Sequence, residues 1–217
     1  MNLQQPFLCF RNTAEPPNRF KICFRNIAEP FFNINIKDEV SIGEDENGYP
    51  IRITLSPAEV QTNCTRYGRL YDWATAMGLP LNCNESSCLN QIQSKHRGIC
   101  PSGWHIPSKG DWDALITAVG GETTAGTKLK AKSGWNENGN GDRYEFSALP
   151  GGGGSGRLDD GVYYFGPVGS FGGWWSASES EYKNYDAYYL IIENYDENTI
   201  WVSNGKVRWF SVRCMKD

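Results

Sequence analysis

The sequence predicts one domain that contains both helices and β-strands and is preceded by an extension over residues 1–33. Three observations predict it: apolar residues at helical spacing, alternating segments near the C-terminus, and a long stretch rich in both glycine and aromatic residues. A length of 217 residues suits one large domain with an appended segment. We therefore expect the domain to cover residues 34–217.

The composition argues against several classes of protein. The net charge of −4 provides no basic surface for nucleic acid. No run of about 18 apolar residues is present, so no membrane span is expected. Seven cysteines without a metal-binding spacing favour disulfides in an oxidising compartment, and the odd number leaves at least one outside an internal pair. We expect an extracellular or cell-surface protein, although no export signal is visible in this numbering.

The N-terminal extension contains a short repeat. Cys9–Pro16 recurs as Cys23–Pro30, with seven of eight positions identical at a period of fourteen residues. Two copies are too few for a stacked repeat fold, and the prolines disfavour regular structure. The expectation is a poorly ordered extension, and the alternative is a docking or crosslinking arm that acts through Cys9 and Cys23.

Two strands and a helix are expected at the start of the domain. Alternating residues predict strands around 34–42 and 49–55, with a turn over 45–48 between them. Apolar residues at helical spacing then predict a short helix over Tyr67–Met77, which Gly78 ends.

A second helix is expected after Pro107. Ser108 is a good N-cap, and Asp111 three residues later completes a pattern similar to a capping box. The apolar face of this helix consists of Trp112, Leu115, Ile116 and Val119. Gly120 is expected to end it in the left-handed conformation.

The C-terminal third is expected to consist of ordered loops followed by strands. Residues 134–173 contain 13 glycines interleaved with aromatic residues, which predicts a long, ordered, loop-rich insertion. The strands expected after it cover residues 174–178, 185–193, 199–204 and 209–215. The last three are expected to form an antiparallel meander.

Alternation within the strand at 185–193 separates its side chains into two faces. The first face carries Tyr185, Ala187, Tyr189 and Ile191, and the second carries Asp186, Tyr188, Leu190 and Ile192. One of the two faces is expected to belong to the core.

Four segments resemble the Fibrobacter major paralogous domain family, in the family's order over roughly residues 64–217. They are Tyr67–Met77, Cys100–Ser108, Phe146–Gly152 and Trp174–Ser178, and the chain then ends with a family-like Phe210–Cys214. The family is itself similar to the C-type lectin-like superfamily, close to formylglycine-generating enzymes. The resemblance implies an α+β, C-type lectin-like fold with two short helices, a small twisted antiparallel sheet and long ordered loops rich in glycine and aromatic residues. Residues 1–60 depart from the family's usual opening segment.

The resemblance also implies a disulfide between Cys100 and Cys214. Cys83 and Cys88 enclose a tight local loop and could pair with each other. Cys9, Cys23 and Cys64 are then left without an assigned partner.

No enzymatic activity is expected. The glycine run at 151–156 matches a nucleotide-binding pattern, but the residues after it are a poor start for the helix that would hold a phosphate. A formylglycine-generating-type oxidase, the enzymatic alternative, works through a cysteine pair near its C-terminus, where this chain has only Cys214. His105 is expected to be packed and hydrogen-bonded.

The favoured function is recognition of a protein or carbohydrate ligand on another cell surface. Tyrosine offers rigid contact area and asparagine offers adaptable hydrogen bonds, as in antibody paratopes. The candidate ligand-binding residues are Tyr163, Tyr182, Asn184, Tyr185, Asp186, Tyr188, Asn194, Tyr195, Asn198, Trp201 and Asn204. This composition also resembles the variable regions of retroelement-diversified proteins. A structural subunit of a surface fibre is the non-binding alternative.

No cofactor is expected, and the turn over Glu193–Asn198 is interpreted as a solvated acidic hairpin without a metal. Calcium is the alternative for this turn, because it is dense in oxygen ligands.

Overall fold

The structure is a computed structural model of the 217-residue chain, and it describes residues 7–9, 40–44, 50–53, 62–63, 65–136, 142–157 and 163–217. Its helices are α2 (Trp73–Met77), α3 (Lys109–Ala118) and α4 (Glu122–Leu129), with the 3-10 helices η1 (Leu81–Asn84) and η2 (Leu89–Gln91). Its strands are β1 (Phe7–Cys9), β2 (Val40–Glu44), β3 (Pro50–Ile53), β4 (Trp104–His105), β5 (Gly154–Arg157), β6 (Tyr163–Phe165), β7 (Phe171–Glu179), β8 (Asp186–Glu193), β9 (Thr199–Gly205) and β10 (Arg213–Lys216). The fold is α+β, as predicted.

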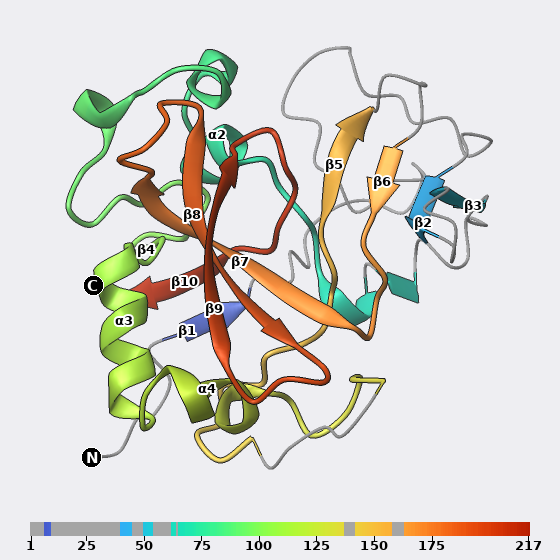
Figure 1. The fold of residues 1–217 in the computed structure, drawn as a ribbon. Helices are drawn as coiled ribbons and strands as arrows, with labels where there is room; N and C mark the ends of the chain where they lie inside the picture. The colour runs from blue at the N-terminus through green and yellow to red at the C-terminus, as the bar shows by residue number, and fades with distance from the viewer. Residues whose placement is uncertain are drawn as a thin grey trace.

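The described strands form three small sheets, and the largest strands make the central one. The strands β7, β8 and β9 are an antiparallel meander, which crosses the middle of the molecule in Figure 1. A four-stranded sheet in the order β3-β2-β6-β5 lies to one side, and β1-β10-β4 form the third sheet. The pair β2–β6 is parallel, which departs from the expected purely antiparallel sheet.

Strand β8 is buried on both faces, so the prediction that only one face belongs to the core is wrong. Ala187 and Tyr189 pack in one apolar cluster, together with Trp73 of α2. Leu190 and Ile192 pack in a second cluster, with residues of α3 and α4. The meander therefore lies between two apolar clusters, and alternate side chains of β8 pack in each of them.

The predicted helix over Tyr67–Met77 is shorter than expected. Asp72 caps α2 by accepting a hydrogen bond from the Thr75 amide, so the helix begins at Trp73. The residue before the cap, Tyr71, instead exchanges backbone hydrogen bonds with Phe210. Gly78 ends α2, as predicted, and adopts the left-handed conformation.

The helix predicted after Pro107 is confirmed as α3. The Ser108 hydroxyl accepts from the Asp111 amide, and the Asp111 carboxylate accepts from the Ser108 amide, which completes the capping box. Gly120 follows the end of the helix with a φ of 111°.

A third helix, α4, was missed by the expectation of two helices. Its sequence contains Thr123, Thr124 and the central Gly126, which are weak helix formers. Packing explains the glycine, because a Cβ at Gly126 would lie 2.3 Å from the carbonyl oxygen of Asn198. Contact with the β8–β9 turn therefore stabilises α4 beyond what its propensity allows.

The prediction that residues 209–215 continue the meander is wrong. After β9, the chain turns at Lys206–Arg208, and Trp209 and Phe210 make isolated bridges to Gly154 and Tyr71. Strand β10 then pairs with β1 on one side and β4 on the other. An alternating sequence identifies a strand but does not identify its partners. In the sheet β1-β10-β4, the Cys100–Cys214 disulfide also holds β10 beside the segment before β4.

Both expected disulfides are present. Cys100 bonds to Cys214 with Cα atoms 5.8 Å apart, which fastens the segment before β4 to β10. Cys83 bonds to Cys88 and closes a loop of six residues. Cys23 and Cys64 lie outside the described residues.

The N-terminal extension is described only at β1, which pairs with β10. The repeat at Cys23–Pro30 and the turn expected over 45–48 lie outside the described residues, and the domain boundary at residue 34 stays a prediction. Among the described helices, none is long and apolar enough to cross a membrane.

Candidate ligand-binding surface

The predicted ligand-binding residues lie at both ends of β8 rather than on one surface. Tyr182, Asn184 and Tyr185 belong to the connection between β7 and β8, here called the tyrosine loop (residues 180–185). Tyr195 belongs to the β8–β9 turn at the opposite end of the strand, roughly 25 Å away at the usual rise per residue (Figure 1). Tyr182 and Tyr195 are 78% and 72% exposed, so each end presents one prominent tyrosine.

The β8–β9 turn is organised by a lysine. The Lys130 ammonium donates to the carbonyl oxygens of Asn194, at 3.2 Å, and Asp196, at 2.8 Å, and the Lys130 side chain is buried. Burial lowers the pKa of Lys130, while Asp196 and Glu197 oppose that shift. Within the turn, the backbone amide of Asn198 donates a hydrogen bond to the Asp196 carboxylate.

This ammonium lies where the sequence suggested calcium. Across the described residues, no group of three or more His, Cys, Asp or Glu side chains could hold a metal ion. The oxygen-rich turn over Glu193–Asn198 therefore has a cation of its own, supplied by Lys130.

Tyr188 and Trp201 lie side by side in the middle of the sheet and contact α3. The Trp201 indole donates to the Asp113 carboxylate at 2.7 Å. The Lys109 ammonium lies 4.9 Å from the centre of the Trp201 ring and 2.9 Å from Asp113. Burial, followed by the charge of Glu181, raises the pKa of Tyr188. These contacts attach β8 and β9 to α3, which leaves the two rings half-buried.

Two other candidates add little exposed surface beside the tyrosine loop, and a third lies in another sheet. Asp186 is only 7% exposed, and Asn204 is half-buried with its side-chain oxygen accepting from the Gly205 amide. Tyr163 lies in β6 of the four-stranded sheet, where it pairs with Val40.

The tyrosine loop has two neighbouring segments that the sequence analysis missed. Leu81 and Leu89, on the flanks of the Cys83–Cys88 disulfide, are 65% and 64% exposed. Val207, in the turn after β9, is also exposed. We call residues 79–92, 180–185 and 205–208 together the loop end. Single aliphatic residues in polar loops have no periodicity, so no sequence pattern marked them.

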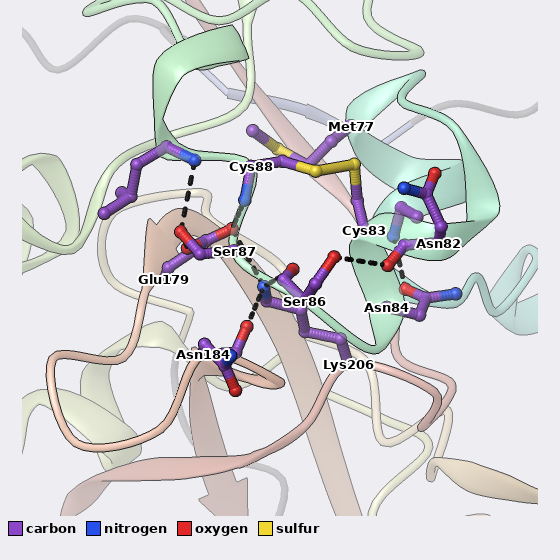
Figure 2. The surroundings of a disulfide bond; sticks show 12 residues. Met77, Asn82, Cys83, Asn84, Ser86, Ser87, Cys88, Glu179, Asn184 and Lys206 are labelled. Atoms are coloured by element: carbon purple, nitrogen blue, oxygen red, sulfur yellow. Dashed lines mark hydrogen bonds and ion pairs between the residues drawn. A yellow bond between two sulfur atoms is a disulfide. The ribbon is translucent and has the colours of Figure 1, made fainter.

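A buried lysine joins the three segments of the loop end. The Lys206 ammonium donates to the carboxylate of Glu179 at 2.8 Å, to the carbonyl of Ser86 at 3.0 Å and to the carbonyl of Asn184 at 2.7 Å. It also lies 4.7 Å from the centre of the Trp73 ring. Figure 2 shows Lys206 with Glu179, Ser86 and Asn184 beside the disulfide.

The Glu179 carboxylate accepts hydrogen bonds from the loop that the disulfide closes, here called the disulfide loop (residues 83–88). The Cys88 amide donates to one carboxylate oxygen at 2.8 Å, and the Ser87 hydroxyl donates to the other at 2.7 Å (Figure 2). Both charged side chains are almost completely buried. A buried ion pair is tolerated when its remaining hydrogen-bonding capacity is filled, and this one meets that requirement.

The described cysteine side chains offer no free thiol, because Cys83, Cys88, Cys100 and Cys214 are all in disulfides. His105 is buried, and its Nδ1 lies 2.7 Å from the Asp217 carboxylate. This agrees with the expected packed histidine and places it in the scaffold.

A family model described as the Fibrobacter succinogenes major domain matches residues 33–216. The match begins well before residue 64, so the similarity to the family covers more of the chain than the segments over roughly residues 64–217 indicated. No curated protein and no solved structure matches the chain.

Proposed function

Because the chain belongs to the Fibrobacter succinogenes major domain family, we propose that it is a non-enzymatic binding module of a bacterial surface. In this proposal, the domain has a C-type lectin-like fold and recognises a protein or a glycan through its loop end. The module is extracellular or cell-surface, which agrees with the presence of two disulfides.

The observation that carries the proposal is the combination of exposure and rigidity at the loop end. Tyr182, Leu81 and Leu89 present large apolar side chains to solvent. The backbone beneath them is fixed by the disulfide and by the buried ammonium of Lys206. Contact residues that are already ordered lose little conformational entropy on binding, which is the condition for a preformed recognition surface.

Binding fits this surface better than catalysis does. An oxidase of the formylglycine-generating type needs reactive thiols, whereas Cys214 is bonded to Cys100 and is buried. The buried charges beneath the loop end, those of Lys206 and Glu179, are paired with each other and shielded from solvent. The resemblance to retroelement-diversified variable regions remains a hypothesis within this proposal.

The test compares one double variant of the loop end with a single control variant. Tyr182→Ala with Tyr185→Ala removes the aromatic side chains of the loop end. Tyr195→Ala removes a tyrosine of similar exposure at the opposite end of β8. Each protein is applied to a glycan array and to an array of purified bacterial surface proteins.

A ligand retained by the wild type and by Tyr195→Ala, but lost by the double variant, supports the proposal. If all variants retain the ligand equally, recognition lies elsewhere on the protein. If the wild type and the double variant retain it but Tyr195→Ala does not, recognition lies at the β8–β9 turn. Oxidation of a substrate cysteine peptide by copper-loaded protein would favour the oxidase alternative.

A further inference from the structure

The disulfide loop and the tyrosine loop share one buried connection. Ser86, inside the disulfide loop, accepts from the Lys206 ammonium, and so does Asn184, inside the tyrosine loop. The Lys206 amide also donates to the carbonyl of Tyr185 at 2.9 Å. Two loops that are about 100 residues apart in sequence therefore depend on the same side chain.

The disulfide loop is also the cover of the ion pair. It supplies three of the groups that satisfy the two charges: the Ser86 carbonyl, the Ser87 hydroxyl and the Cys88 amide. If this loop opened, Lys206 and Glu179 would lose these partners while remaining in an apolar environment beside Trp73. A buried charge without its partners is strongly unfavourable, so the pair would rearrange toward water.

We propose that the Lys206–Glu179 pair couples the two loops, so that the redox state of Cys83–Cys88 controls how the tyrosine loop is held. In the oxidised state, the closed disulfide loop keeps the ion pair covered and the tyrosine loop ordered. A dithiol reductant transfers two electrons and two protons to the disulfide, which gives two thiols, and the dithiol becomes a disulfide. The opened loop then releases the ion pair, and the tyrosine loop loses its anchor at Asn184.

The functional consequence rests on the proposed function, but the coupling itself does not. Lys206 and Glu179 act here as positioning residues, since neither side chain reaches the surface. Cys100–Cys214 supplies no group to the ion pair, so it acts as an internal comparison during reduction.

Residue-resolved amide hydrogen exchange of the full chain tests the coupling without a ligand. The reporters of the tyrosine loop are the amides of Tyr182 and Asp186, with that of Lys206, all of which are hydrogen-bonded. In Cys83→Ala with Cys88→Ala, these three amides should exchange at least about tenfold faster. The Asn194 amide, at the opposite end of β8, donates to Ser170 and should keep its rate.

Unchanged exchange at the three reporters, with faster exchange inside residues 83–88, would overturn the coupling. If the double alanine variant does not fold, Ser87→Ala replaces it, because this change keeps the disulfide and removes one hydrogen bond to Glu179. The expected acceleration in that variant is about threefold at the same amides, and no acceleration there would equally overturn the proposal.

Coupling is reciprocal, so loosening the ion pair should expose the disulfide. Lys206→Met should accelerate reduction of Cys83–Cys88 by dithiothreitol about tenfold, with the rate at Cys100–Cys214 unchanged, as followed by alkylation and peptide mass. Equal acceleration at both disulfides would indicate general destabilisation and count against the coupling. If the exchange and reduction experiments show the coupling but the wild-type protein binds no ligand on either array, only the proposed function is contradicted.

Discussion

The ammonium of Lys206 lies 2.8 Å from the carboxylate of Glu179, and neither side chain is accessible to solvent. The pair lies where α2, the disulfide loop and the C-terminal ends of β7 and β9 meet, and it draws its remaining hydrogen-bond partners from the disulfide loop and the tyrosine loop. This arrangement makes the loop end a single structural unit.

Removing one partner of this pair should be far more harmful than removing both. Lys206→Met leaves the Glu179 carboxylate buried without its cation, and should lower the free energy of unfolding by about 3–5 kcal/mol. Lys206→Met combined with Glu179→Gln should recover a large part of that loss, since no uncompensated charge remains. Urea denaturation of the two variants measures the difference, and equal losses would contradict it.

The two disulfides should differ in their contribution to stability. In the chain-entropy description, the six-residue loop of Cys83–Cys88 contributes about 2 kcal/mol and the long loop of Cys100–Cys214 about 5 kcal/mol. Alanine pairs at each disulfide should therefore lower the thermal midpoint by clearly different amounts. The comparison is made by calorimetry on both variants, and a larger loss from the short loop would argue against an entropic origin.

The contact between α4 and the β8–β9 turn should not tolerate a Cβ. Gly126→Ala would place a methyl group against the carbonyl oxygens of Glu197 and Asn198, so the variant should be destabilised by about 1–3 kcal/mol. Gly110→Ala in α3 is the matched control, because its Cβ would meet only the Ser108 hydroxyl at 3.7 Å. The control should gain about 0.5–1 kcal/mol from its higher helix propensity.

Alkaline pH should weaken the fold through Tyr189. Burial raises the pKa of Tyr189 above the ordinary 10.0, so the phenol keeps its proton in the folded state while the unfolded chain loses it. The unfolded state then binds fewer protons, and the free energy of unfolding falls as the pH rises above about 10. Below pH 10, this contribution is present in full.

Tyr189→Phe removes the titrating group and should flatten that decline. The variant should be less stable at neutral pH by about 1 kcal/mol, since the hydroxyl has a hydrogen bond with Asn204, and the two curves should converge as the pH rises. Tyr182→Phe, at an exposed position, should leave the stability at neutral pH unchanged. Thermal midpoints between pH 8 and 11 give both comparisons, and parallel curves for Tyr189→Phe would show that another group dominates.

Local features could be predicted where neighbouring residues decide them. The capping box of Ser108 and Asp111 involves residues three apart, and Gly78 ends α2 by its own backbone preference. The disulfide between Cys100 and Cys214 was implied by the family resemblance, because its 114-residue separation gives no local signal.

Features that depend on distant contacts escaped prediction. Helix α4 has weak propensity, and its Gly126 is required by the Asn198 carbonyl from a turn about 70 residues later. The partners of β10 and the burial of both faces of β8 likewise follow from which elements lie beside them. The candidate site divides into two parts for the same reason. Its residues are close in sequence, but those before and after β8 are separated in space by the length of the strand.

The sequence by itself determined the α+β class, the caps of its helices and the segments that carry exposed tyrosine. These follow from backbone preferences and from hydrophobic periodicity, which act over a few residues. Only the tertiary structure decided that Lys206 is buried and joins the disulfide loop to the tyrosine loop, and that Lys130 binds the carbonyls of the oxygen-rich turn. The physical reason is that a buried ammonium must gather acceptors from wherever the fold brings carbonyls together, and no sequence pattern records those distances.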